Sequence, residues 1–96
     1  MKVIINNTCD VDLKHIRLIE EKINRLSQKF SRLLYTEVFI KSEGQSPEVY
    51  KVHVRLGVPG DDIIIKEQAT SPSLIIKRII ERMHRYLNKQ KEIIKR

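Results

Sequence analysis

Two long segments in which apolar residues recur every three or four positions constrain the fold of this chain more than any other feature. They span residues 12–33 and 71–94. This spacing places the apolar side chains on one side of an α-helix, so each segment is predicted to be an amphipathic helix. Asp12 can cap the first helix, and Ser71 followed by Pro72 is a typical start for the second. Each helix needs another layer against which to bury its apolar side.

Four shorter segments have the composition of β-strands. They are rich in β-branched or aromatic residues and cover residues 3–5, 35–42, 49–56 and 62–69. In the third segment, Tyr50, Val52, Val54 and Leu56 alternate with polar residues, which predicts a strand with one buried and one solvated face. Glycine and proline in the connections at residues 43–47 and 58–61 predict two tight turns, and therefore a meander of the last three strands.

The resulting order β-α-β-β-β-α predicts an α+β fold with a four-stranded mixed sheet and two roughly parallel helices packed on one face. No linker or repeat divides the 96 residues, so we expect one domain spanning residues 1–96. The single cysteine, Cys9, cannot form an internal disulfide and is interpreted as a small apolar residue. A fold without an internal disulfide is usual in a reducing cytoplasm, so we expect a cytoplasmic protein. No segment is typical of a signal peptide or a membrane span.

Positive charge is concentrated in the two predicted helices. The chain has a formal net charge of +7, and residues 12–33 and 71–96 together carry fourteen Lys or Arg against five Asp or Glu. At helical spacing, four cations form a stripe on each helix: Lys22, Arg25, Lys29 and Arg32 on the first, and Arg78, Arg82, Arg85 and Lys89 on the second. Because few acids are interleaved with them, the stripes predict binding to a polyanion, with nucleic acid as the favoured class.

Other interpretations of these patterns remain open. The stripes could be solvated helix faces, or the protein could be a membrane-surface or acidic-protein adaptor, or an RNA-binding module of another kind. His15, His53 and His84 lack metal-ligand spacing, and no catalytic or phosphate-loop motif is present, so we expect no enzyme activity, metal, cofactor or small-molecule substrate. Tyr35 and Phe39 could stack on bases from a strand face, but packing or partial exposure is the favoured interpretation for both.

In its ordered motifs the whole chain resembles the short, single-domain ribosome hibernation-promoting factors, also called ribosome-associated inhibitors or sigma-factor modulation proteins. The resemblance rests on Met1-Lys2-Val3-Ile4-Ile5, on Glu21-Lys22-Ile23-Asn24-Arg25-Leu26 closing on Phe30, on Val58-Pro59-Gly60 with Lys66-Glu67 after it, and on the segment from Arg82 to Lys91. The sequence departs from the family pattern at the start of the second helix, where it reads Ser71-Pro72-Ser73-Leu74-Ile75-Ile76-Lys77.

The resemblance implies that two basic helices bind ribosomal RNA of the small subunit where messenger and transfer RNA would sit, and so silence idle ribosomes. Residue by residue, Lys22 and Arg25 match the family's basic positions on the first helix, and Arg82, Arg85, Lys89 and Lys91 match those on the second. The long family members carry a C-terminal domain that pairs ribosomes. This chain ends at Arg96, so we expect a monomer without that dimerisation domain.

Overall fold

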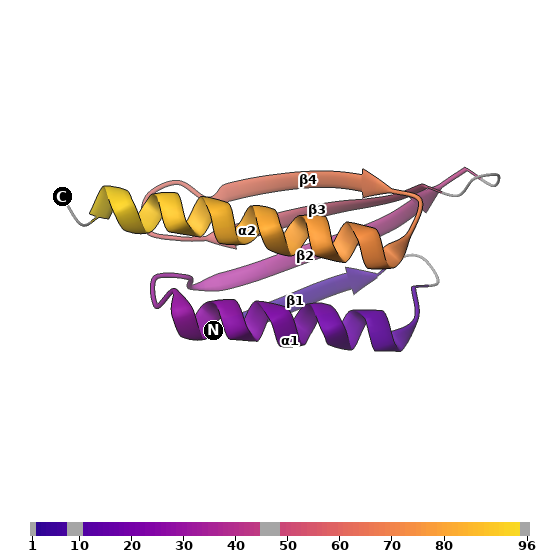
Figure 1. Ribbon diagram of the computed structural model, residues 1–96, viewed down its shortest axis with the longest axis horizontal. Coiled ribbons are helices and arrows are strands. Elements are labelled where there is room, and N and C mark those ends of the chain that lie inside the picture. Colours follow the sequence, from indigo (N-terminus) through magenta and orange to yellow (C-terminus); the bar gives the residue numbers. More distant parts are fainter. Residues whose placement is uncertain (1, 8–10, 45–48, 95–96) are drawn as a thin grey trace.

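The computed structural model describes residues 2–7, 11–44 and 49–94, with side chains up to residue 89. Four strands and two helices follow one another in the predicted order (Figure 1). Their bounds are β1 (Lys2–Asn7), α1 (Leu13–Lys29), β2 (Tyr35–Glu43), β3 (Val49–Gly57), β4 (Ile63–Ala69) and α2 (Pro72–Ile94). The predicted α+β class and element order are therefore confirmed.

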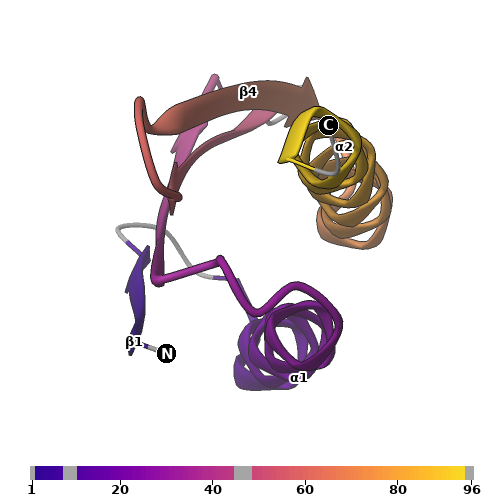
Figure 2. The ribbon, with the colours of Figure 1, turned by 90° about the vertical axis from the view of Figure 1, so that its left-hand side faces the viewer.

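The four strands form one mixed sheet in the order β1-β2-β3-β4. β1 pairs with β2 in parallel, whereas β2, β3 and β4 form an antiparallel meander. Both helices lie on the same side of this curved sheet, α1 beside β1 and α2 beside β4 (Figure 2). They run in the same direction along the sheet (Figure 1), as the sequence predicts. Among the described elements, none of the helices covers the opposite face of the sheet (Figure 2).

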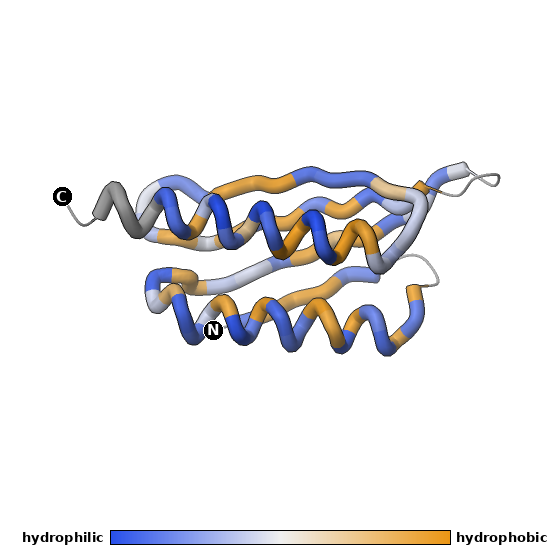
Figure 3. The backbone as a smooth tube through the Cα atoms, in the orientation of Figure 1, coloured by the Kyte–Doolittle hydropathy of each residue, from blue (hydrophilic) through white to orange (hydrophobic). Residues whose placement is uncertain are grey.

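The core lies between the sheet and the two helices. Alternate residues of the central strands point into it, among them Val38, Val54 and Leu56, each at most 1% exposed. Ile23 of α1 and Met83 of α2 meet them and are fully buried. Along both helices, hydrophobic and hydrophilic residues alternate at the helical period (Figure 3). This pattern fixes which side of each helix faces the sheet and leaves the charged sides in solvent.

The start of α2 agrees with the predictions, whereas both ends of α1 differ from them. Ser71 caps α2 as expected, since its Oγ accepts a hydrogen bond from the Leu74 amide at 3.4 Å. Asp12 stands at the N-cap of α1, but its side chain makes no capping hydrogen bond, and only its backbone oxygen receives the His15 and Ile16 amides. The helix also ends at Lys29 instead of residue 33. The apolar spacing continues past this end because Phe30 and Leu33 remain buried in the non-helical turn that follows.

The connection between β3 and β4 contains Gly60 at φ +94°, a conformation that glycine adopts without strain, and Pro59 precedes it as in a tight turn. Cys9 and most of the β2–β3 connection lie outside the described residues.

Candidate nucleic-acid interface

The first cationic stripe, which we call the α1 stripe, consists of Lys22, Arg25, Lys29 and Arg32. Its members are exposed except for Lys22, which is half-buried. Arg32 was predicted to lie on the helix, but it lies in the turn that follows, because α1 ends at Lys29. Arg25 donates a hydrogen bond to Glu21 Oε1 at 2.7 Å, one helical turn away. Such an exposed pair contributes little to stability and can exchange partners readily. Lys29 lies 3.0 Å from His84 of α2, so this member of the stripe lies on the side of α1 that faces α2.

His84 joins the two helices at this point. Because an ammonium group only donates hydrogen bonds, His84 Nε2 must accept from Lys29 Nζ. The imidazole ring packs edge-on against Phe30, with 5.7 Å between ring centroids, and its Nδ1 lies 3.1 Å from the Asn88 amide nitrogen. His84 therefore connects Lys29 of α1 with α2. The sequence offered no signal for this role, because the two residues are 55 positions apart.

The second stripe, the α2 stripe, consists of Arg78, Arg82, Arg85 and Lys89, and half of it is engaged with the sheet. Arg82 Nη1 donates to the backbone oxygen of Lys66 at 2.7 Å and to Glu67 Oε2 at 2.9 Å. Its Nη2 donates to the Tyr86 hydroxyl at 3.4 Å, and the guanidinium lies 5.8 Å from the centre of that ring. The hydrogen bonds to Tyr86 and Glu67 raise the pKa of Arg82 above its ordinary value.

Arg78 makes a similar contact one turn earlier, where its Nη1 donates to the backbone oxygen of Gln68 at 3.1 Å. Both arginines therefore lie on the flank of α2 that borders β4. Since β4 is the strand farthest from β1 and α1 lies beside β1, this flank points away from α1. Lys29 of the α1 stripe faces the neighbouring helix, whereas Arg78 and Arg82 of the α2 stripe do not.

The structure thus corrects the expectation that the stripes have almost no counter-charge, because Arg25 and Arg82 each pair with a carboxylate. Among the described side chains, four stripe cations have neither an ion pair nor a hydrogen bond: Lys22, Arg32, Arg85 and Lys89. These four are the residues most available to an external anion. Lys91 lies within α2, but its side chain is outside the described part of the chain.

The remaining histidines do not form a site with the acids. His15 Nε2 lies 3.3 Å from Ser73 Oγ and links the beginnings of the two helices, while His53 is on the face of the sheet opposite to them. Within the described residues, no three His, Cys, Asp or Glu side chains gather as a metal-binding group. None of the helices, as far as they are described, is both long and apolar enough to cross a membrane.

Comparison with known proteins finds a family that matches the sequence and solved structures that share the fold. Residues 3–95 match the model of a family described as "Sigma 54 modulation protein / S30EA ribosomal protein". Among solved structures, a ribosomal subunit interface protein from Coxiella burnetii aligns with a TM-score of 0.80 at 14% identity, covering 96% of this chain and 99% of the other. The N-terminal domain of Protein Y from Thermus thermophilus aligns with a TM-score of 0.72 at 17% identity, covering 92% and 93%. Comparison with curated proteins gave no significant match.

Proposed function

Because the chain belongs to the Sigma 54 modulation protein / S30EA ribosomal protein family, we propose that it binds the small ribosomal subunit through ribosomal RNA. In this proposal it occupies the region of messenger and transfer RNA in idle ribosomes and so inhibits translation. It acts in the cytoplasm as a single RNA-binding domain and a monomer, and it is not an enzyme. The two solved structures share its fold, and one of them is described as a ribosomal subunit interface protein.

The observation that carries the proposal is the exposed charge of the two parallel helices. Arg32, Arg85 and Lys89 are exposed and have no acidic partner among the described side chains, and Lys29 and Arg25 extend the same charge along α1. Cations without partners repel one another, and an RNA backbone removes this repulsion when its phosphates approach. A rigid pair of helices can match the folded shape of an RNA without reading its sequence.

Arg78 and Arg82, which are bound to the sheet, contribute to RNA binding in a different way from the other cations. Arg78 and Arg82 already donate to β4, so a phosphate must either share their remaining N–H groups or replace existing hydrogen bonds. We therefore assign the main phosphate contacts to Lys22, Arg25 and Lys29 of α1, to Arg32 in the turn after α1, and to Arg85 and Lys89 of α2. Arg78 and Arg82 contribute at the flank, and Lys91 extends the α2 contacts.

The direct test is co-sedimentation with purified small subunits. The double variant Arg85→Glu, Lys89→Glu should weaken binding by more than about tenfold, because two phosphate contacts become repulsive. The matched control is Lys2→Glu, Arg17→Glu, which changes the charge equally at exposed positions outside both stripes. Unchanged binding of the first variant, or an equal loss in both, would refute the assignment. Anionic vesicles serve as the second ligand: sedimentation with vesicles as strong as with subunits would instead favour a membrane-surface protein.

A further inference from the structure

The face of the sheet without helices carries a second set of groups suited to nucleic acid. One residue from each strand forms a row across this face: Asn6, Phe39, His53 and Lys66 are consecutive partners in the strand register. Phe39 is 42% exposed, a large fraction for a phenylalanine at the centre of a sheet. His53, directly opposite Phe39 on β3, is exposed as well. Two flat rings therefore stand side by side in solvent.

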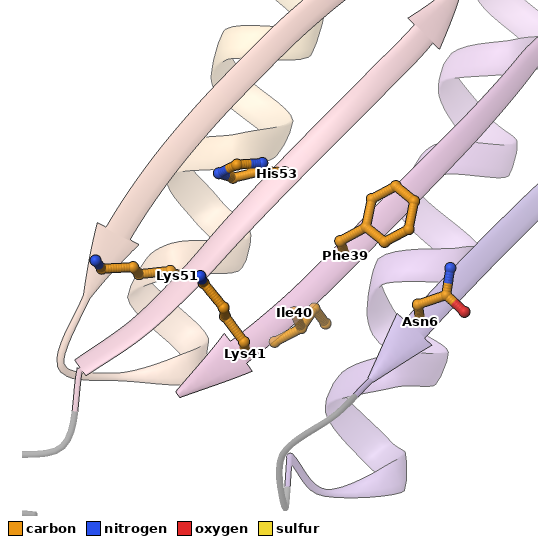
Figure 4. A pocket seen from close by; sticks show the side chains of 6 residues that line it. All are labelled: Asn6, Phe39, Ile40, Lys41, Lys51 and His53. Carbon is orange, nitrogen blue, oxygen red and sulfur yellow. The ribbon is translucent and has the colours of Figure 1, made fainter. Parts of the chain in front are cut away.

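Two hollows lie on this face and share His53 and Lys51. The first, of about 260 Å³, is lined by Asn6, Phe39, Ile40, Lys41, Lys51 and His53 (Figure 4). The second, of about 290 Å³, is lined by Lys51, His53, Lys66, Glu67 and Gln68. His53 thus stands between the hollows, and Phe39 borders the first of them. A planar group that enters either hollow meets an aromatic ring.

Positive charge surrounds these rings on one side. Lys41 and Lys51 are partners in the next row, and both contact one carboxylate, Glu43, at 3.5 and 2.9 Å. Lys66 has no ion pair among the described side chains. Of the three ammonium groups at this end, Lys41 and Lys51 share the Glu43 carboxylate, and Glu67, which lines the second hollow, is paired with Arg82 instead. Toward the other end, Glu37 lies opposite Arg55, and Arg55 donates to Asp62 at 2.9 Å, so that half of the face is balanced.

We propose that this open sheet face binds a single-stranded RNA segment, with bases stacked on Phe39 and His53 and phosphates bound by Lys41, Lys51 and Lys66. Aromatic rings on a sheet with flanking cations provide both attractions that an unpaired strand needs, since stacking holds the bases and ammonium groups hold the backbone. A duplex does not fit this site because its bases already stack on one another. Because the positive and negative charges cancel at the end with Arg55, the phosphates are expected to bind only at the end with the lysines.

The site is separate from the helices, so it can be tested independently of ribosome binding. The probe is a labelled ten-nucleotide single strand of adenines, measured by fluorescence anisotropy, with a duplex of equal length as the comparison. Phe39→Leu, which keeps an apolar side chain but removes the ring, should weaken binding of the single strand roughly 5- to 150-fold. Phe39→Tyr keeps the ring and should bind within about twofold of the wild type. Lys41→Gln, Lys66→Gln should weaken binding and flatten its salt dependence.

An amide NMR titration with the same oligonucleotide locates the contact. We expect the largest shifts at β2 and β3 around Phe39 and His53, and the helix variant Arg85→Glu, Lys89→Glu should retain these shifts. The proposal is overturned if Phe39→Leu binds like the wild type, if the shifts are confined to α1 and α2, or if no binding is detected at millimolar oligonucleotide. It is also overturned if the duplex or an oligoglutamate peptide binds as tightly, because either result would reflect charge alone.

Discussion

The Arg82 guanidinium and the Glu67 carboxylate form an ion pair at 2.9 Å between α2 and β4, and both side chains are mostly shielded from solvent, at 31% and 21% exposure. The same guanidinium holds the backbone oxygen of Lys66. A residue at a basic position of the family pattern thus also attaches a helix to the sheet. Its loss would therefore affect folding as well as binding.

The first prediction concerns this attachment. Arg82→Gln should lower the free energy of unfolding by about 1 kcal/mol, because it removes the ion pair and leaves the Glu67 carboxylate partly buried without its partner. Arg85→Gln, one turn away and exposed, should change it by less than about 0.5 kcal/mol. Urea denaturation followed by circular dichroism measures both. Equal effects of the two substitutions would show that the contact with β4 contributes nothing.

The second prediction concerns salt. If about six phosphates are neutralised by the stripes, the logarithm of the affinity for small subunits should fall with the logarithm of salt concentration at a slope of about −4 to −5. Arg85→Gln, Lys89→Gln should make this slope shallower by about 1.5, because two contacts are lost. Sedimentation across a salt series gives the slope. A wild-type value near −1 would be incompatible with a phosphate clamp.

The third prediction follows from Tyr35, whose hydroxyl donates to Asp62 at 2.7 Å. This hydrogen bond raises the pKa of Tyr35 above its ordinary value of 10.0. Because the folded state favours the protonated phenol, the stabilisation is complete below pH 10 and decreases as the pH rises through the raised pKa. The wild type should therefore be more stable than Tyr35→Phe at pH 8, and its advantage should shrink toward pH 11. Urea midpoints of both proteins across this range test it, and a constant difference would contradict it.

The fourth prediction concerns Gly57, which lies opposite Tyr35 in the sheet. A Cβ atom at Gly57 would overlap the Tyr35 ring, so Gly57→Ala should destabilise the fold by about 1 to 3 kcal/mol. In a Tyr35→Ala background the ring is absent, and the same substitution should cost much less. A double-mutant cycle of unfolding free energies measures the difference. If the effects of the two substitutions on the unfolding free energy were additive, the Tyr35 ring would move aside without cost.

The element order was predictable from the sequence because it depends on local spacing. Alternation decides which side of a strand is buried, as around Val52 and Val54, and the helical period decides it for α1 and α2. The structure confirms the predicted sides. The end of α1 was missed because Phe30 and Leu33 continue the apolar period in a turn, where their burial comes from tertiary packing.

For the candidate site, the sequence predicted which cations share a helix face but not the residues that they contact. Helical spacing grouped the cations, but it could not show that Arg82 reaches Glu67 or that Lys29 meets His84, since these partners come from other elements. The sequence interpretation also favoured packing or partial exposure for Phe39. The strand register then brought His53 beside it, and register is set by pairing between strands that spacing within one strand does not reveal.

The contacts of Arg78 and Arg82 with backbone oxygens of β4 have a consequence for self-association. An edge strand with free backbone groups invites pairing with a strand of a second molecule, and bulky charged side chains laid along it obstruct such pairing. If an RNA drew both guanidinium groups away, it would expose this border to aggregation. We therefore expect that an RNA bound as proposed would use Arg85 and Lys89 and would leave Arg78 and Arg82 bound to the edge of the sheet.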